Sequence, residues 1–169
     1  MKKRIITITV LVVVILVVAW RFWPNSFVKL MPYDMESATH CTAIADIMVV
    51  SNGRVKSDSY KMEDMSSESL KKIMELLETS KYRRDFRNLI PFWPQSLSSG
   101  KYFDGRAVHI YIYFPTAEGE YGDGINISWT GGQMAIWGIS KYKARIYHPT
   151  DNETFDYLVG YLQANGVLQ

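Results

Sequence analysis

The chain contains a single cysteine and only six prolines, and it has no large excess of charge of either sign. Cys41 alone cannot form an intrachain disulfide, so a hydrophobic core must hold the fold together. A chain of 169 residues is long enough for one core of ordinary size. We therefore expect one folded domain and a short additional segment.

The charge balance argues against a nucleic-acid partner. The whole chain carries 19 Lys and Arg against 17 Asp and Glu, but four of the basic residues lie within the first 21 positions. Residues 24–169 carry 15 basic and 17 acidic side chains. Nucleic-acid binding requires a concentrated positive surface that releases counterions. We therefore expect no nucleic acid among the partners.

One long hydrophobic run is present near the N-terminus. From Ile5 to Trp23, every residue except Arg21 is apolar, aromatic or threonine. At about 1.5 Å per residue, such a helix approaches the ~30 Å of a bilayer's hydrocarbon core. We therefore predict a single transmembrane helix within residues 1–23, with membrane contact through residues 5–23.

The residues that flank this run predict its orientation. Basic side chains precede it, and aromatic side chains close it in the position of an interfacial belt. We expect the N-terminus in the cytoplasm and the rest of a single-pass membrane protein outside. A cleaved signal peptide is the alternative, although bulky aromatics occupy the positions where a peptidase requires small residues.

The rest of the chain divides into a linker and a domain. Residues 24–42 contain two prolines and no regular period, which is typical of a stalk, and residues 43–169 form the predicted domain. Alternation and turn signals predict strands near 44–50, 54–62, 108–114, 125–130, 133–139 and 143–147, with a less regular strand within 81–89. Helical spacing predicts helices near 67–78 and 151–164.

The order of these elements predicts the fold class. Strands and helices are grouped rather than alternating along the chain, which favours an antiparallel sheet over a parallel one. We expect an α+β domain in which two helices pack on one face of an antiparallel β-sheet.

This arrangement resembles a loose group of small, uncharacterised exported domains of Gram-positive bacteria. In that group a membrane anchor or lipoprotein signal precedes a β-hairpin, a helix and an aromatic meander, and the segments here that carry the likeness are 70–77, 82–86 and 109–113. The likeness covers most of residues 43–162 and rests on pattern rather than on a diagnostic motif. It implies an envelope location and brings no catalytic residues.

Two groups of side chains are candidates for binding. Arginines near position 85 suit phosphate or carboxylate groups, and neighbouring aromatic faces suit sugars. Aromatic side chains of the strand near 108–114 would form a partner-binding surface if the helices cover the other face. Packing of the aromatics into the core is the alternative for both groups. The candidate binding residues are Arg83, Arg84, Arg87, Trp93, Tyr111 and Tyr113.

No catalytic constellation is visible. Three Ser-x-x-Lys matches lack the companion motifs of penicillin-recognising enzymes, and the acidic loop 118–124 lacks the regular ligand spacing of known calcium loops. We predict no catalytic residue, no metal site and no cofactor.

Two functions are therefore open. We expect a membrane-anchored, extracytoplasmic and non-enzymatic domain that binds an envelope polymer or a protein partner. The alternative is a small envelope hydrolase whose site is assembled from His109 and nearby carboxylates such as Asp104 or Asp123. A cleft that gathers a histidine with two carboxylates would favour this alternative.

Overall fold

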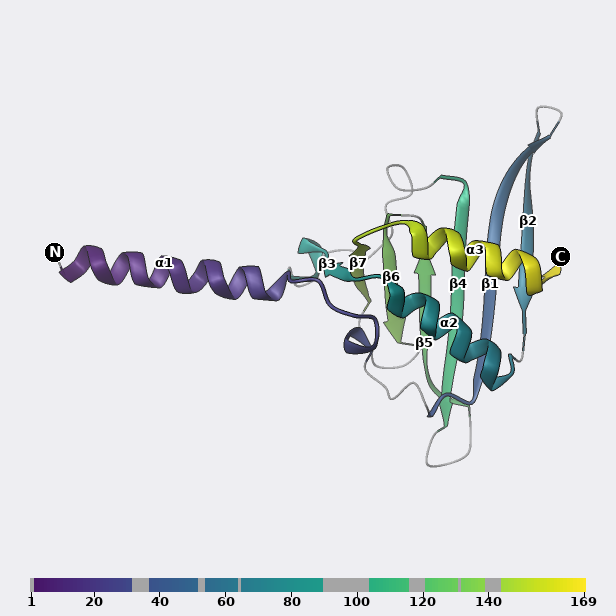
Figure 1. Ribbon diagram of the computed structural model, residues 1–169, viewed down its shortest axis with the longest axis horizontal. Coiled ribbons are helices and arrows are strands. Elements are labelled where there is room, and N and C mark those ends of the chain that lie inside the picture. Colours follow the sequence, from purple (N-terminus) through teal and green to yellow (C-terminus); the bar gives the residue numbers. More distant parts are fainter. Residues whose placement is uncertain are drawn as a thin grey trace.

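The computed structural model describes residues 2–31, 37–51, 54–63, 65–89, 104–115, 121–130, 132–138 and 144–169. Its eight strands form one antiparallel sheet in the order β3-β7-β6-β5-β4-β1-β2-β8 (Figure 1). The strands are β1 (His40–Ser51), β2 (Arg54–Met62), β3 (Tyr82–Arg84), β4 (Arg106–Pro115), β5 (Tyr121–Trp129), β6 (Met134–Gly138), β7 (Arg145–Pro149) and β8 (Val167–Leu168). The helices are α1 (Lys2–Arg21), α2 (Ser67–Thr79) and α3 (Glu153–Asn165). The predicted α+β class with an antiparallel sheet agrees with this architecture.

Helices α2 and α3 lie side by side on one face of the sheet (Figure 1). Period-two alternation directs one apolar set of side chains toward them, and we call this side the helix face. The strands supply Cys41, Ala43, Val108, Ile110, Ile112, Ile125, Ile127, Trp129, Met134 and Ile136 to the core beneath the helices. The helices supply Ile73, Leu77, Phe155, Leu158 and Leu162. The core therefore lies between the sheet and one layer of helices.

The ends of the two helices follow local sequence signals. The Ser66 side chain accepts a hydrogen bond from the backbone N–H of Ser69 at 3.2 Å and so caps the first turn of α2. At the end of α3, the backbone N–H of Gly166 donates to the carbonyl of Leu162 at 2.8 Å. A Cβ atom at position 166 would lie only 2.6 Å from that carbonyl oxygen. Glycine is therefore required where the chain leaves α3 for β8.

Part of the segment expected to be a linker belongs to the domain. Backbone hydrogen bonds join Asn25 and Tyr82 in both directions, at 3.0 and 2.8 Å. Phe27 is fully buried, with its ring 5.9 Å from that of Tyr82, and Leu30 is 4% exposed. Phe27 and Leu30 of this segment therefore enter the core although no regular period in the sequence marks them. Strand β1 also begins earlier than predicted, at His40.

The prediction of a transmembrane helix is contradicted. Among the described residues, no helix has both the length and the apolar composition that crossing a membrane requires. The transmembrane part of the predicted fold class, the signal-anchor and the single-pass extracytoplasmic location are corrected accordingly.

Candidate functional site

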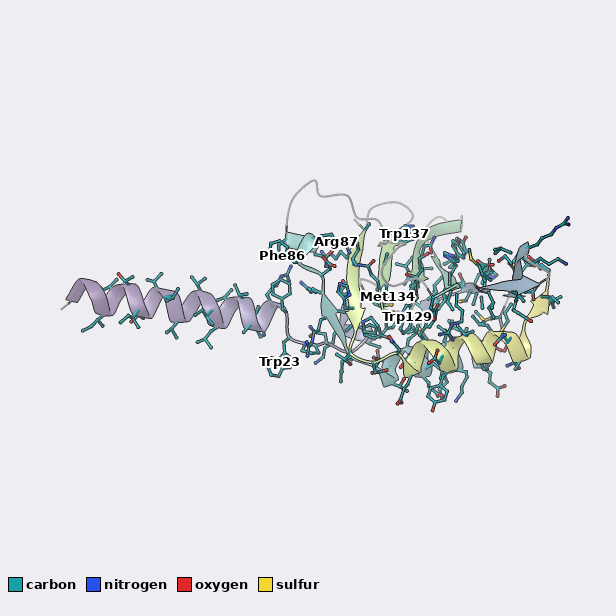
Figure 2. All side chains as sticks on the ribbon, turned by 90° about the horizontal axis from the view of Figure 1, so that it is seen from above. Trp23, Phe86, Arg87, Trp129, Met134 and Trp137 are labelled. Atoms are coloured by element: carbon teal, nitrogen blue, oxygen red, sulfur yellow. The ribbon has the colours of Figure 1, made fainter. Side chains whose placement is uncertain are left out.

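The sheet face opposite α2 and α3 carries polar and aromatic side chains, and we call it the polar face. Figure 2 shows Trp137 on this side of the sheet and Trp129 and Met134 on the side of the helices. The described side chains of the polar face include Thr42, Asp46, His109, Tyr111, Tyr113, Asn126, Ser128, Trp137 and His148. The predicted binding residues Tyr111 and Tyr113 are both half-buried here.

Strand pairing places an amide between two aromatic rings. Tyr111 of β4 lies directly opposite Asn126 of β5, and Asn126 lies opposite Trp137 of β6. All three side chains are half-buried. Neighbouring strands are about 4.8 Å apart, so the two aromatic positions are separated by roughly 10 Å. The carbonyl oxygen of Asn126 has no hydrogen-bond partner within the described part of the chain. We call this row the aromatic row.

His109 lies on the same face of β4 as Tyr111, two residues before it. Its imidazole ring lies between the side chains of Ser128 and Asp46. Its Nδ1 is 2.5 Å from the hydroxyl of Ser128, and its Nε2 is 3.8 Å from Oδ2 of Asp46. The Asp46 carboxylate also accepts a hydrogen bond from the hydroxyl of Ser59. Burial lowers the pKa of His109, and the charge of Asp46 acts in the opposite direction. The imidazole is therefore favoured in its neutral form.

This serine–histidine–aspartate line lacks features that hydrolysis requires. Ser128 is only 3% exposed and sits within a central strand that pairs on both sides. Backbone N–H groups that are bound in a sheet cannot also stabilise an oxyanion. The 3.8 Å separation between His109 and Asp46 is too long for a hydrogen bond. We therefore interpret the hydrogen bond between Ser128 and His109 as a structural contact between β5 and β4.

The carboxylates expected near His109 lie elsewhere or are not described. Asp104 accepts a hydrogen bond from the Arg106 side chain at 3.0 Å, and Arg106 also pairs with Asp156 at 2.8 Å. The side chain of Asp123 lies outside the described residues. Asp46 is the carboxylate that approaches the histidine instead.

The predicted binding residue Arg87 is held in a buried ion cluster with Asp85. Its Nε and Nη2 lie 3.0 and 2.9 Å from the two carboxylate oxygens, and its backbone N–H donates to the same carboxylate at 2.7 Å. Nε2 of His148 lies 2.7 Å from the carboxylate, and Nδ1 lies 3.1 Å from the carbonyl of Gly132. Both partners of the imidazole accept hydrogen bonds, so the ring bonds both only with a proton on each nitrogen.

The cluster stabilises the charged form of Asp85. Burial alone would raise the pKa of this carboxyl, but hydrogen bonds from Arg87 and His148 and the charge of Arg87 lower the pKa to about 2. Asp85 is 9% exposed. The cluster joins the turn that follows β3 to β7, where the side chain of Asn88 also accepts a hydrogen bond from the Ile146 backbone N–H at 2.9 Å. Arg87 thus stabilises the fold through its ion pair with Asp85.

The remaining predicted arginines lie at the β3 edge of the sheet, away from the aromatic row. Arg83 is exposed, and Arg84 is half-buried with an Nε atom that has no hydrogen-bond partner within the described residues. A cavity of about 140 Å³ is lined by Trp20, Arg21, Trp23, Asn25 and Arg84. Trp93, the last of the predicted residues, lies outside the described residues. The structure therefore separates the arginines from Tyr111 and Tyr113.

Three residues that form hydrogen bonds or close polar contacts on the polar face were not predicted from the sequence. Asp46 follows the alternation of β1, and its side chain could have been assigned to the face of His109 if the register between β1 and β4 had been known. Asp85 and His148 are 63 positions apart, and no local pattern connects them. Pairing of β3 with β7 brings them together.

Metal sites and relatives add no further assignment. Within the described ranges, no group of three or more His, Cys, Asp or Glu side chains is arranged to hold a metal ion. Residues 118–120 of the predicted acidic loop lie outside those ranges, and residues 121–124 belong to β5. No protein-family model matches the sequence, and neither the curated proteins nor the solved structures yield a match.

Proposed function

We propose that this chain is a non-enzymatic binding domain, and that the aromatic row on the polar face binds a glycan. The observation that carries the proposal is the juxtaposition of Tyr111, Asn126 and Trp137 on three adjacent strands. Flat aromatic rings stack on the C–H faces of sugar rings, and an amide between them can accept and donate hydrogen bonds to hydroxyls. The Asn126 carbonyl oxygen is buried and has no hydrogen-bond partner among the described residues, so a sugar hydroxyl reaches it only if the side chains around it move.

The chemistry of the surrounding face favours a sugar over a protein partner. The core of a protein interface is a continuous apolar patch, depleted of charge. Here the described neighbours of the aromatic row include the polar side chains of Thr42, His109 and Ser128, together with Tyr113 and Ala135. Hydroxyl, imidazole and amide groups spaced along a rigid sheet match the hydroxyl groups of a polysaccharide. A protein partner becomes an outcome of the test.

The test measures retardation of the full-length chain in native gels cast with soluble polysaccharides. We expect at least one neutral or anionic polysaccharide to slow migration relative to a plain gel. Tyr111→Ala and Trp137→Ala should each weaken that retardation by about tenfold or more, because stacking on a buried aromatic contributes about 1–3 kcal/mol in comparable flat-ring sites. Circular dichroism of each variant verifies that the fold is retained.

Tyr157→Ala is the matched control. Tyr157 is 64% exposed on α3, on the opposite side of the molecule, so its removal should leave retardation unchanged. The proposal fails if no polysaccharide slows the wild-type chain, or if all three variants lose retardation equally. If a purified protein binds instead and Tyr111→Ala abolishes that binding, the aromatic row is a protein-binding surface and the glycan proposal is wrong.

The hydrolase alternative rests on the line from Ser128 through His109 to Asp46. Its test is the rate of hydrolysis of a nitrophenyl ester by the wild-type chain and by His109→Gln. We expect equal rates, because Ser128 is buried and its strand offers no oxyanion donors. A rate at least tenfold higher in the wild-type chain would restore the alternative.

A further inference from the structure

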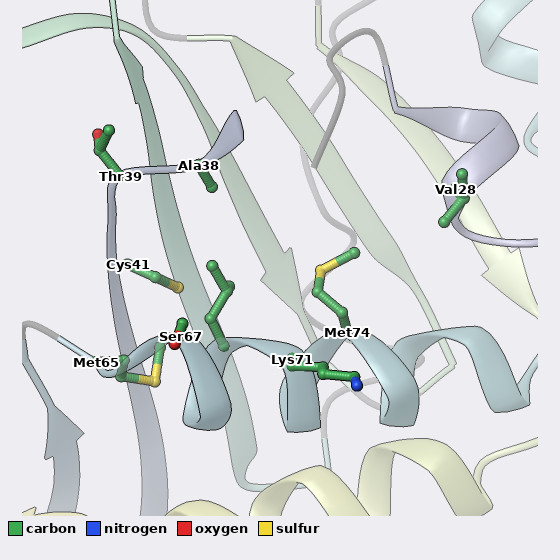
Figure 3. A pocket seen from close by; sticks show the side chains of 9 residues that line it. Val28, Ala38, Thr39, Cys41, Met65, Ser67, Lys71 and Met74 are labelled. Carbon is green, nitrogen blue, oxygen red and sulfur yellow. The ribbon is translucent and has the colours of Figure 1, made fainter. Parts of the chain in front are cut away.

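A second candidate site lies away from the polar face, in a cavity between α2 and the start of β1. Its volume is about 560 Å³, within the range of small-molecule sites in proteins. It is lined by Val28, Ala38, Thr39, Cys41, Met65, Ser67, Leu70, Lys71 and Met74. Figure 3 shows Cys41, Met65 and Met74 around the space between the helix and the strand.

The walls of the cavity are mainly apolar and adaptable. Met65 and Met74 approach from α2 and the segment before it, and Leu70 lies between them along the chain. Methionine is unbranched and polarizable, and it is common on surfaces that accept flexible apolar ligands. Such walls fit an alkyl chain better than a rigid polar molecule.

Cys41 forms part of the wall as an apolar group. Its side chain is 1% exposed, and burial raises the pKa of the thiol to about 12. The thiol therefore stays protonated at neutral pH and is a poor nucleophile. The backbone N–H of Met65 donates to the Cys41 carbonyl at 3.3 Å. This hydrogen bond joins the segment before α2 to the start of β1 at one end of the cavity.

The polar side chains that line the cavity are one lysine and two neutral hydroxyl groups. Lys71 is exposed at the edge of the cavity, and it is the only charged side chain among the described residues that line it. In the described part of the chain no acidic group lies within ion-pair distance of Lys71, whereas the adjacent Lys72 pairs with Glu75 at 3.6 Å. The hydroxyls of Thr39 and Ser67 complete the polar rim. A negative head group on an apolar chain would complement this arrangement.

We propose that this cavity binds a single-chain amphipathic anion of the fatty-acid class, with its alkyl chain against Met65, Leu70 and Met74 and its carboxylate at Lys71. The proposal is independent of glycan binding, because the cavity and the aromatic row share no residue. Among the described residues Lys71 has no ion-pair partner, and a cation so placed beside an apolar cavity selects an anion over a neutral amphiphile.

The experiment titrates decanoate, below its aggregation concentration, into the full-length chain labelled with ¹³C at the methionine methyl groups. We expect saturable shifts of the Met65 and Met74 signals. Met48 is 50% exposed on the β1–β2 hairpin and Met134 is fully buried beneath the helices, so both signals should stay unchanged as internal controls. This readout needs no variant and does not depend on the folding of a mutant.

Two comparisons test the role of Lys71. Decanol has the same chain without the charge, and we expect it to bind about tenfold more weakly, because it makes no charge-assisted contact with Lys71. Lys71→Gln should remove this preference, whereas the matched variant Lys72→Gln should keep it. Leu70→Trp, which fills the cavity, should prevent binding of both ligands.

Three results would overturn the proposal. The first is an absence of shifts at Met65 and Met74 up to the solubility limit of decanoate. The second is equal binding of decanoate and decanol that Lys71→Gln leaves unchanged, which would indicate an apolar cavity without anion selectivity. The third is a dependence of the Met65 and Met74 signals on protein concentration in the absence of ligand, which would make a second copy of the chain the occupant.

Discussion

The two faces of the sheet are stabilised by different kinds of interaction. On the helix face, Val108, Ile110 and Ile112 alternate along β4 into a core without charged groups. On the polar face, buried or half-buried histidines form hydrogen bonds to Ser128 and to Asp85. The first face gains from removal of apolar area from water, which is non-directional. The second depends on partners in defined geometry.

This difference suggests that the helix face stabilises the sheet and that the polar face positions side chains for binding. An apolar core tolerates substitutions that conserve volume, whereas a buried hydrogen-bonded pair tolerates few. Side chains on the polar face are placed precisely, and the sheet backbone beneath them is held by the helix face. A binding surface built there gains rigidity from the core without exposing it.

The largest effect should come from the helix face. Trp129 is fully buried, with its ring 5.5 Å from Phe155 and 5.9 Å from Tyr82. We expect Trp129→Ala to lower the free energy of unfolding by about 3–5 kcal/mol, because the site cannot collapse to fill the cavity. Urea denaturation followed by far-UV circular dichroism measures this.

Trp137→Ala is the corresponding change on the polar face. Because Trp137 is half-buried, we expect a loss of about 1 kcal/mol. Equal losses for the two tryptophans would show that both faces are packed as cores, and the contrast drawn above would be wrong.

The second effect concerns the ion cluster at Asp85. The pKa of this carboxyl is about 2 when folded, against an ordinary value of 3.8, so its ionised form adds about 2 kcal/mol of stability. The contribution is complete above about pH 4 and disappears as the pH falls toward 2. Asp85→Asn should therefore destabilise the chain by at least about 2 kcal/mol at pH 7 and flatten the acid limb of stability against pH.

Asp104→Asn provides the control for this measurement. Asp104 also pairs with an arginine, but its side chain is 42% exposed. Exposed pairs contribute about 0–1 kcal/mol, so this variant should change stability little at any pH. An unaltered acid limb in Asp85→Asn would contradict the assignment of Asp85 as the group that titrates.

The smallest effect should come from Ser128. Its hydroxyl bonds the neutral imidazole of His109, and Ser128→Ala removes that bond while leaving the volume almost unchanged. We expect a loss of about 1 kcal/mol at pH 7 or above in thermal or urea unfolding. Ser57→Ala, at an exposed position of β2, should have no effect. A neutral result at Ser128 would mean that water replaces the bond and that the polar face is less rigid than its geometry suggests.

Local signals were sufficient for the elements that depend on neighbours in sequence. The helix near 67–78 was predicted from its spacing, and α2 spans Ser67–Thr79. Alternation and turn signals predicted strands near 44–50 and 54–62, and β1 pairs with β2 as far as Ser51 and Arg54. The alternation of Val108, Ile110 and Ile112 with polar and aromatic residues predicted a strand with two different faces, and it left open which face the helices would cover.

Features that depend on tertiary pairing could not be predicted in the same way. Burial of Phe27 and Leu30 requires contact with Tyr82 and α2, and no period in residues 24–42 signals it. The aromatic row requires the registers of three strands, so Tyr111 was a candidate while Asn126 and Trp137 were only considered as part of an outer face. Arg87 was predicted to bind a ligand because arginines and aromatics lie close together in this part of the sequence, and its ion pair with the buried Asp85 was not foreseen. The transmembrane helix was predicted from the length and apolar composition of one run and from its flanking residues, and this prediction is contradicted.

The lengths of the outermost strands affect how copies of the chain meet. Strand β3 has three residues and β8 has two, so each end of the sheet offers few free backbone groups to another molecule. Beyond β8, the outer strand β2 continues with the charged residues Arg54, Lys56 and Asp58, and charged side chains on an edge strand discourage its pairing with another chain. The sheet therefore ends at both sides in features that discourage growth into fibrils, a protection that a chain with so many β-strands requires at high concentration.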